Sequence, residues 1–411
     1  MRILLLTDSY PPEVRSASHL MYEFANGLAE RKHKVTVVTA SPGYNLAEGT
    51  EVRRTRFASI SEESGVRVIR IWSLPFHNVS RITRGIGQLG LTISMFIGGL
   101  ISGKVDVIFI YSPPLTMGLA GVLLGRTKRV PYVLNVQDLF PQNAIDLGVL
   151  RGRLLIRLFE SMESLVYKCA NLITVHSVGN SQHILSKTHD SRKIKVIPNW
   201  VDLTEYQPGA RGQIFRSKHN ILEETVVVLF AGVMGYAQDL TAVIEAAWIL
   251  RTEKQIIFLL VGDGVEKPRL QSQVKEWGLK NVQFLPFVSK EAYPELVAAS
   301  DIGLITLKKT MRTPVVPSKV FGYMAAGKPC VLSVNPESDA ISIVKNAECG
   351  IVVHAGDPSA LAEAIRFLSQ GKGDACEMGP RGRVYAEKHF SKCVALDRYE
   401  KLLQDLLVPP I

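Results

Sequence analysis

Cysteine is scarce in this chain, and chemistry that depends on cysteine is not expected. The sequence holds five cysteines, and no two of them form a C-x-x-C pair. Their scatter argues against a disulfide framework or a zinc site and favours a reducing compartment, the cytoplasm. The five are Cys169, Cys330, Cys349, Cys376 and Cys393.

Several motifs of hydrolases and metal-dependent enzymes are also missing. The sequence has no G-x-S-x-G, no H-E-x-x-H, no G-K-S/T and no D-x-D. These absences disfavour α/β-hydrolases, zinc proteases, P-loop nucleotidases and enzymes that hold a metal–nucleotide complex on paired aspartates. We therefore expect no bound metal. The first residues, Met1–Thr7, are typical of a β-strand rather than of a signal peptide.

Negative charge is comparatively scarce in the first half of the chain. Residues 1–200 hold 24 Lys and Arg against 14 Asp and Glu, whereas residues 201–411 hold 24 of each. The net charge of +10 therefore comes from the first half. This asymmetry favours an anionic partner such as membrane headgroups or a lipid pyrophosphate, and a solvated basic surface is the alternative. No basic run is interleaved with aromatic residues, so we expect no nucleic-acid partner.

Short apolar runs alternate with helical stretches along the chain, and the pattern restarts after a polar interval near 202–224. Such runs predict an α/β protein whose parallel sheets are covered on both faces. The first set of expected strands is Arg2–Asp8, Lys34–Ala40, Arg67–Leu74, Val105–Ser112, Val130–Asp138, Leu172–Ser177 and Lys193–Asn199. The second set is Thr225–Gly232, Gln255–Gly264, Val282–Phe287, Asp301–Leu307, Pro329–Val334 and Gly350–Val353.

The repeat predicts two doubly wound, Rossmann-like domains. We place the first at residues 1–203 and the second at 204–392. An amphipathic helix beginning at Cys393 follows the second set of strands, and we expect residues 393–411 to pack back across the first domain.

Residues 85–103 contain no charged residue and are flanked by Arg81, Arg84 and Lys104. The stretch is just long enough to cross a bilayer, but its glycines and polar residues make it a poor membrane span. Three interpretations stay open: a plain packed helix between two strands, a helix dipping into the membrane interface, and, least favoured, a true span.

Ligands in open α/β sheets bind beyond the carboxyl ends of the strands, which selects a few loops. Gly232 and Gly235, and the run from Gly262 to Gly264, would allow phosphate to approach the backbone closely. Residues 313–334 carry a further signal. We expect a helix with Pro317 at its first position, Ser318 and Lys319 in its opening turn, and Gly327 at its end. A helix start with a lysine suits an anion.

The order of these segments resembles the retaining glycosyltransferases of family 4, which have the GT-B fold. The matching segments include YPPE at 10–13, KIKVIPNWVDLTEY at 193–206, FAGVMGYAQDL at 230–240, LLVGDGVEKPRL at 259–270 and PSKVFGYMAAGKPCVL at 317–332. The segments YSPPL, VQDLFPQNAIDLG, GYAQDL and VPSK are most similar to the bacterial fucosaminyltransferase-like branch, which builds O-antigen, capsule or exopolysaccharide units on a polyprenyl diphosphate carrier.

The resemblance implies two domains facing a central cleft, with the donor bound mainly by the second domain and the acceptor mainly by the first. The implied donor residues are Gly232, Gly235, Gln238, Gly262, Asp263, Gly264, Pro286, Phe287, Pro317, Ser318 and Lys319. The implied acceptor residues are Tyr10, Pro11, Arg15, His19, Gln137 and Asp138. Lys319 and Asp138 are the catalytic candidates, although Asp138 could instead orient the loop at 137–143.

The chain also departs from the family pattern. Two glutamates common in the family would fall at Pro314 and Gly322, and the Arg and Lys that clamp the donor diphosphate would fall near Val233 and Gln238. Lys319 is the candidate to replace them, with Lys308, Lys309 and Arg312 in reserve.

The expected function is a metal-independent, retaining glycosyltransferase without a cofactor. It would use a nucleotide-sugar, a UDP-sugar being favoured, and a lipid-linked glycan at the inner face of the cell membrane. The alternatives are a non-catalytic GT-B partner subunit, which the two missing glutamates motivate, and a nucleotide-sugar epimerase.

Overall fold

The computed structural model describes residues 1–13, 15–43, 46, 57–74 and 81–408. It divides into two compact units, Met1–Pro198 with Ala395–Ile411, and Asn199–Val394. The sequence boundary at 203/204 thus lies five residues beyond the structural one, because the polar segment after Pro198 already belongs to the second unit.

The first unit is built on an eight-stranded sheet in the order β3-β4-β2-β1-β5-β6-β7-β8. Seven strands are parallel, and β3 pairs antiparallel with β4 at the edge. The central strands β5 and β6 are buried throughout, and β1 is buried after Arg2, as their apolar runs predict. The strands are β1 (Arg2–Leu6), β2 (Lys34–Ala40), β3 (Ala58–Glu63), β4 (Val66–Ile71), β5 (Val107–Ser112), β6 (Tyr132–Val136), β7 (Leu172–Val175) and β8 (Ile194–Val196).

Helices cover both faces of this sheet. The apolar side chains of α2, α3 and α5 share one core cluster with β1, β5 and β6. The helices are α1 (Ser16–Glu30), α2 (Arg81–Ile101), α3 (Met117–Lys128), α4 (Gln142–Asp146), α5 (Arg153–Cys169) and α6 (Val178–Thr188), with a 3-10 turn η1 (Ser191–Lys193). Among the described residues, no helix combines the length and the apolar content that crossing a bilayer requires.

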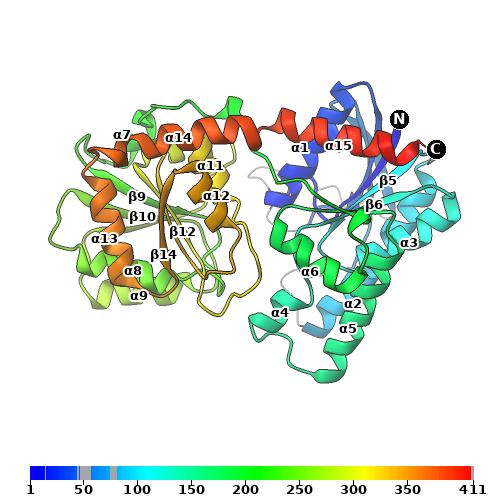
Figure 1. The fold of residues 1–411 in the computed structure, drawn as a ribbon, viewed down its shortest axis with the longest axis horizontal. Helices are drawn as coiled ribbons and strands as arrows, with labels where there is room; N and C mark the ends of the chain where they lie inside the picture. Colours follow the sequence, from blue (N-terminus) through cyan, green and yellow to red (C-terminus); the bar gives the residue numbers. More distant parts are fainter. Residues whose placement is uncertain (14, 44–45, 47–56, 75–80, 409–411) are drawn as a thin grey trace. The chain divides into compact units, whose positions relative to one another are not determined.

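The last helix, α15 (Lys392–Leu407), lies beside α1 in the first unit (Figure 1). Tyr399 is fully buried there, with ring centroids 5.0 Å from Phe24 and 5.6 Å from Phe109. Its hydroxyl accepts a hydrogen bond from the buried Asn135 amide at 3.0 Å. Glu400 pairs with Arg31 at 2.7 Å. The chain end therefore packs on the first unit, as expected.

The second unit holds a six-stranded parallel sheet in the order β11-β10-β9-β12-β13-β14. The strands are β9 (Val226–Ala231), β10 (Ile256–Val261), β11 (Val282–Leu285), β12 (Ile302–Thr306), β13 (Cys330–Val334) and β14 (Gly350–His354). The connections are η2 (Leu203–Glu205), α7 (Gln213–Lys218), α8 (Leu240–Ile249), α9 (Lys267–Glu276), α10 (Tyr293–Ala299), α11 (Lys319–Ala325), α12 (Ala340–Ala347), α13 (Pro358–Ser369) and α14 (Asp374–His389).

Several expected elements need correction. The strand β3 was not expected, because its polar sequence ASISEE lacks an apolar run. The helix α14 was also not expected, since Pro380 lies inside it. Most strands are one to three residues shorter than predicted, because the polar residues at their ends form the loops.

Candidate active site

Two glycine turns lie side by side at the carboxyl edge of the second sheet. The loop after β9 and the loop after β10 are joined by hydrogen bonds, Met234 N–H to the Asp263 carbonyl at 2.8 Å and Glu266 N–H to the Met234 carbonyl at 3.0 Å. Gly262 has φ +140°, and a Cβ there would lie 1.9 Å from the Gly232 carbonyl oxygen. Only glycine fits this crossing, so Gly262 allows the two loops to pack backbone against backbone.

Lys319 lies against the first of these turns. A Cβ on Gly232 would come within 2.9 Å of Lys319 Cε and 3.2 Å of its Nζ. The ammonium also lies 4.9 Å from the centre of the Phe230 ring. Among the described residues, none accepts a hydrogen bond from this ammonium or pairs with it. Burial lowers the pKa of Lys319 to about 8. An unpaired, poorly solvated ammonium beside an open backbone turn is suited to an anion.

The structure places the other expected donor residues around the same edge. Gln238 follows the first turn and donates its N–H to the Gly235 carbonyl at 3.1 Å. Asp263 is exposed and its carboxylate accepts the Gly264 N–H at 2.8 Å. Pro286 and Phe287 are exposed directly after β11. At Gly235, by contrast, a Cβ would make only an ordinary contact with Val233, so the chain itself does not require glycine there.

The helix start at Lys319 differs from the prediction. The helix α11 begins at Lys319, two residues after the expected first position at Pro317, and Ser318 is its N-cap. The Val320 N–H is bonded to the Pro317 carbonyl and the Phe321 N–H to the Ser318 carbonyl, each at 3.2 Å. These amides are therefore occupied. The anion-binding capacity of this segment rests on the lysine rather than on the helix end.

The positions of the two missing glutamates are filled in different ways. Gly322 is buried, and a Cβ there would lie 3.5 Å from the Tyr206 hydroxyl and 3.7 Å from that of Tyr293. The two phenol groups occupy the space that a longer side chain would need. Pro314 lies in the loop between β12 and α11. Among the described residues, the reserve candidates Lys308, Lys309 and Arg312 form no ion pair either.

A polar cluster occupies the carboxyl ends of β1, β5 and β6 in the first unit. Asp8 is buried and accepts a hydrogen bond from Arg15 at 3.1 Å, while its other carboxylate oxygen has no partner among the described residues. Glu13 lies 3.8 Å from the same guanidinium. Burial raises the pKa of Tyr111, and Asp138 and Asp8 raise it further.

Asp138 joins this cluster from the end of β6. Its side chain is exposed, and among the described residues it accepts no hydrogen bond, so it does not cap the loop that follows. Although Asp138 reaches solvent, the surrounding protein atoms partly desolvate its carboxylate and raise its pKa, and the Asp8 carboxylate adds to this effect. Asp8 was missed at the sequence level because it was assigned to the first strand. The strand-end rule that selected Asp138 would also have selected it.

The remaining acceptor candidates take part in structural contacts. Tyr10 is buried, and desolvation raises its pKa. The Pro11 carbonyl accepts a bond from Arg70 at 2.7 Å. His19 lies one turn from Glu23 on α1, with 2.9 Å between Nε2 and the carboxylate. Gln137 donates to Asn135 at 2.8 Å.

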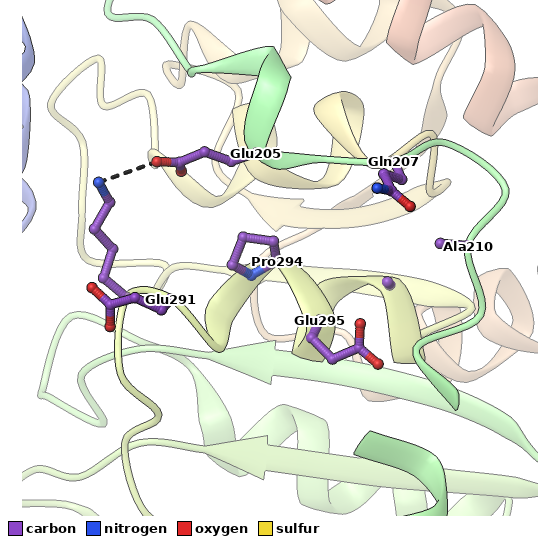
Figure 2. Close-up of a pocket in the computed structure, with 8 residues that line it drawn as sticks. Glu205, Gln207, Ala210, Glu291, Pro294 and Glu295 are labelled. Atoms are coloured by element: carbon purple, nitrogen blue, oxygen red, sulfur yellow. Dashed lines mark ion pairs between the residues drawn. The ribbon is translucent and has the colours of Figure 1, made fainter. Parts of the chain in front are cut away.

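A separate cavity of about 410 Å³ opens between η2 and α10 in the second unit (Figure 2). Its lining includes Glu205, Gln207, Lys290, Glu291, Pro294 and Glu295. Glu205 pairs with Lys290 at 3.1 Å, and Glu295 accepts the N–H groups of Ile214 and Phe215. The lining holds three carboxylates against one ammonium, so its charge is negative. A diphosphate would be repelled there, so the cavity does not compete with the Lys319 site.

Comparison with known proteins agrees with the division of the chain into two compact units. The model of the group 1 glycosyl transferases matches residues 213–384, and that of the glycosyl transferase 4-like domain matches residues 17–200. The two matches cover one compact unit each. The chain is a GT-B glycosyltransferase of the family 4 type.

Curated relatives of this glycosyltransferase carry related names. The chain is 27% identical over 345 residues to WcaI of Escherichia coli K12, named for a colanic acid biosynthesis glycosyl transferase, covering 81% of this chain and 83% of WcaI. It is 26% identical over 352 residues to WbjE of Pseudomonas aeruginosa, named as a glycosyltransferase, covering 82% and 84%.

Among solved structures, Anabaena HepE in complex with UDP superposes with a TM-score of 0.74 at 18% identity, covering 98% of this chain and 100% of that one. This likeness shows the shared fold. Glycosyl transfer in glycan biosynthesis follows from the family models and the named relatives, while the donor, the individual sugar and the acceptor are matters for proposal.

Proposed function

We propose that this glycosyltransferase moves a sugar from a UDP-sugar to a polyprenyl-diphosphate-linked or other membrane-anchored glycan, with retention of configuration and without a metal. The donor sugar belongs to the N-acetylated deoxyhexosamines, such as N-acetylfucosamine, by resemblance to the fucosaminyltransferase-like branch. The enzyme acts at the inner face of the cell membrane. The observation that carries the proposal is the unpaired Lys319 ammonium beside the Gly232 turn.

Lys319 supports the departure of the diphosphate. As the bond between the sugar C1 and the phosphate oxygen breaks, charge develops on the leaving group, and a fixed ammonium stabilises that charge more than the ground state. Because Gly232 has no side chain, the Lys319 ammonium lies directly against the backbone of this turn, where we place the phosphates. This arrangement supplies the positive charge that a metal ion provides in other transferases.

The acceptor hydroxyl forms the new bond to C1 on the face that the diphosphate leaves. Its proton passes to an oxygen of the leaving phosphate, so bond breaking and proton transfer balance without a separate base. In the first unit, Asp138 and Arg15 are proposed to contact the acceptor: Asp138 as a hydrogen-bond acceptor for a sugar hydroxyl, and Arg15 as a contact for phosphate. Asp8 holds Arg15 at 3.1 Å in the cluster.

The donor is tested by thermal unfolding with UDP-, GDP-, dTDP- and ADP-sugars in separate samples. A bound ligand stabilises the fold by RT ln(1 + [L]/Kd), so we expect a rise in Tm with UDP-sugars. No shift with UDP-sugars and a shift with another nucleotide would contradict the donor assignment.

The reaction is tested with the identified donor and a polyprenyl-diphosphate-linked sugar. We expect product only when both are present, and an NMR spectrum that shows the donor's anomeric configuration in the product. Product from the donor alone, or inversion at C1, would refute the proposed reaction. Lys319→Ala should lower kcat/KM by about tenfold to a thousandfold, which is the value of one group that stabilises transition-state charge.

A further inference from the structure

The longest helix of the first unit has two chemically different faces. Gly98 and Gly99 of α2 point inward: a Cβ on Gly98 would lie 2.4 Å from Val38, and one on Gly99 would lie 2.3 Å from Leu124. They let the helix lie close to the sheet and to α3. Leu91 and Met95 are fully buried on the same side. Gly98 and Gly99 therefore serve packing, whereas a Cβ on Gly85 or Gly103 would meet no neighbouring atom among the described residues.

The outward face of α2 carries large aliphatic side chains instead. They follow a spacing of three or four residues and form one stripe along the helix. Ile93, near the middle, exposes 61% of its surface. The stripe consists of Ile86, Leu89, Ile93, Ile97 and Leu100.

A second exposed apolar stripe lies on α5. Leu154 exposes 84% of its surface, and Leu155, Leu158 and Leu165 are also exposed. The inner side of α5 packs against α3 through Val166. A Cβ added to Gly118 of α3 would lie 2.1 Å from the Val166 side chain. Since α3 contacts both α2 and α5 over the same core, the two stripes belong to one helical layer. We call its outer surface the α2–α5 face.

Basic side chains predominate on this face. The two acidic residues of α5, Glu160 and Glu163, lie 3.8 and 3.7 Å from the ammonium of Lys187 on α6. The segments 81–101, 117–128 and 147–159 contain no Asp or Glu. Arg153, Arg157 and Lys168 lie along one side of the α5 stripe, and Arg126 is exposed on α3. Among the described residues, none of the three arginines forms an ion pair. The side chains of Arg81 and Arg84, which the sequence places at the start of α2, lie outside the described residues.

We infer that the α2–α5 face docks onto an anionic lipid membrane. Leucine and isoleucine side chains can enter the interface between headgroups and acyl chains while arginines beside them contact lipid phosphates. A second copy of this chain is a poorer fit, because a symmetric contact would bring arginine against arginine. The inference rests on the proposed function for the lipid nature of the acceptor, and it assigns the membrane contact to particular helices.

Vesicle co-sedimentation of the full chain tests this assignment without donor or acceptor. We expect binding to vesicles of phosphatidylcholine with phosphatidylglycerol and much weaker binding to phosphatidylcholine alone. The double variant Arg153→Glu with Arg157→Glu should weaken binding to the anionic vesicles by about twenty-fold or more, since each surface arginine contributes about fivefold to such binding. Leu89→Ser with Ile93→Ser should weaken it by about tenfold or more through lost apolar burial.

Matched controls come from the second unit. Val384 on α14 exposes 65% of its surface, and Lys275 on α9 is exposed without an ion pair among the described residues. Val384→Ser and Lys275→Glu should leave vesicle binding unchanged. Equal loss in the controls, or unchanged binding in both α2–α5 variants, would overturn the assignment.

Two further measurements keep the outcomes separate. Light scattering shows whether the chain self-associates, and a dimer that the α2–α5 variants convert to monomer would assign the face to a second copy and overturn the membrane inference. Transfer to a water-soluble, short-chain acceptor should be the same in wild type and variants. A chain that binds vesicles but transfers no sugar would refute the proposed reaction while leaving the docking face intact.

Discussion

Replacing Lys319 with methionine should make the ligand-free protein more stable. Burial lowers the pKa of this lysine from 10.5 to about 8, which means that the folded protein disfavours the charged form. One pKa unit corresponds to about 1.36 kcal/mol, so at neutral pH the charge destabilises the fold by about 3 kcal/mol. Lys319 keeps some contact with solvent, and this remaining hydration reduces the expected gain to about 1–3 kcal/mol.

The effect has a defined pH dependence. Below pH 8 the lysine is charged in both the folded and the unfolded chain, so the penalty is complete. Between pH 8 and 10.5 the folded chain releases its proton while the unfolded chain keeps it, and the penalty falls. Above pH 10.5 both states are neutral, and the variant should lose its advantage.

Thermal unfolding measures this prediction. A gain of 1–3 kcal/mol corresponds to a rise in Tm of roughly 2–10 °C for a unit of this size. UDP should raise the Tm of the wild type and not that of Lys319→Met. The control is Lys392→Met, because the Lys392 ammonium donates a hydrogen bond to the Asp202 carboxylate at 3.2 Å. That variant should be less stable than wild type. If Lys319→Met is destabilised like the control and still responds to UDP, the proposed anion site is wrong.

Three further changes test other parts of the structure. Gly262→Ala should prevent folding of the second unit or lower its Tm strongly, since the Cβ would meet the Gly232 carbonyl at 1.9 Å; a normal melting curve would contradict this geometry. Asp8→Asn should move the acidic limb of the pH profile of kcat/KM to lower pH, because Asp8 helps to raise the pKa of Asp138. An unchanged acidic limb would show that Asp8 does not influence the titration of Asp138. Tyr399→Phe should cost about 1 kcal/mol in chemical denaturation through loss of the hydroxyl's bond to a buried asparagine of β6, and unchanged stability would show that this bond contributes nothing.

The sequence predicted those features that depend on strand order. Once the apolar runs are arranged as parallel strands, the turns at Gly232 and Gly262 must lie at one edge, and Lys319 follows from its place after β12. The same reasoning brings Asp138 to the corresponding edge of the first sheet. Local patterns were less reliable. A proline at 317 predicted a helix start, yet the loop keeps Pro317 and Ser318 outside the helix.

Other features depend on contacts that a sequence does not display. The glycines of α2 suggested either a membrane segment or a packed helix, and only the positions of Val38 and Leu124 show that they face inward. The tyrosines beside Gly322 come from η2 and α10, far away along the chain. Distant partners of this kind determine the environment of a side chain, whereas local periodicity determines only whether a segment forms a helix or a strand.

The position of α15 also determines the order in which this protein can be made. Phe24 and Phe109 lie within the first 198 residues, but the aromatic ring that packs against both is that of Tyr399. A ribosome therefore synthesises the entire second unit before the core of the first unit can close. Until α15 has been made, Phe24 and Phe109 lack the third ring of this aromatic cluster.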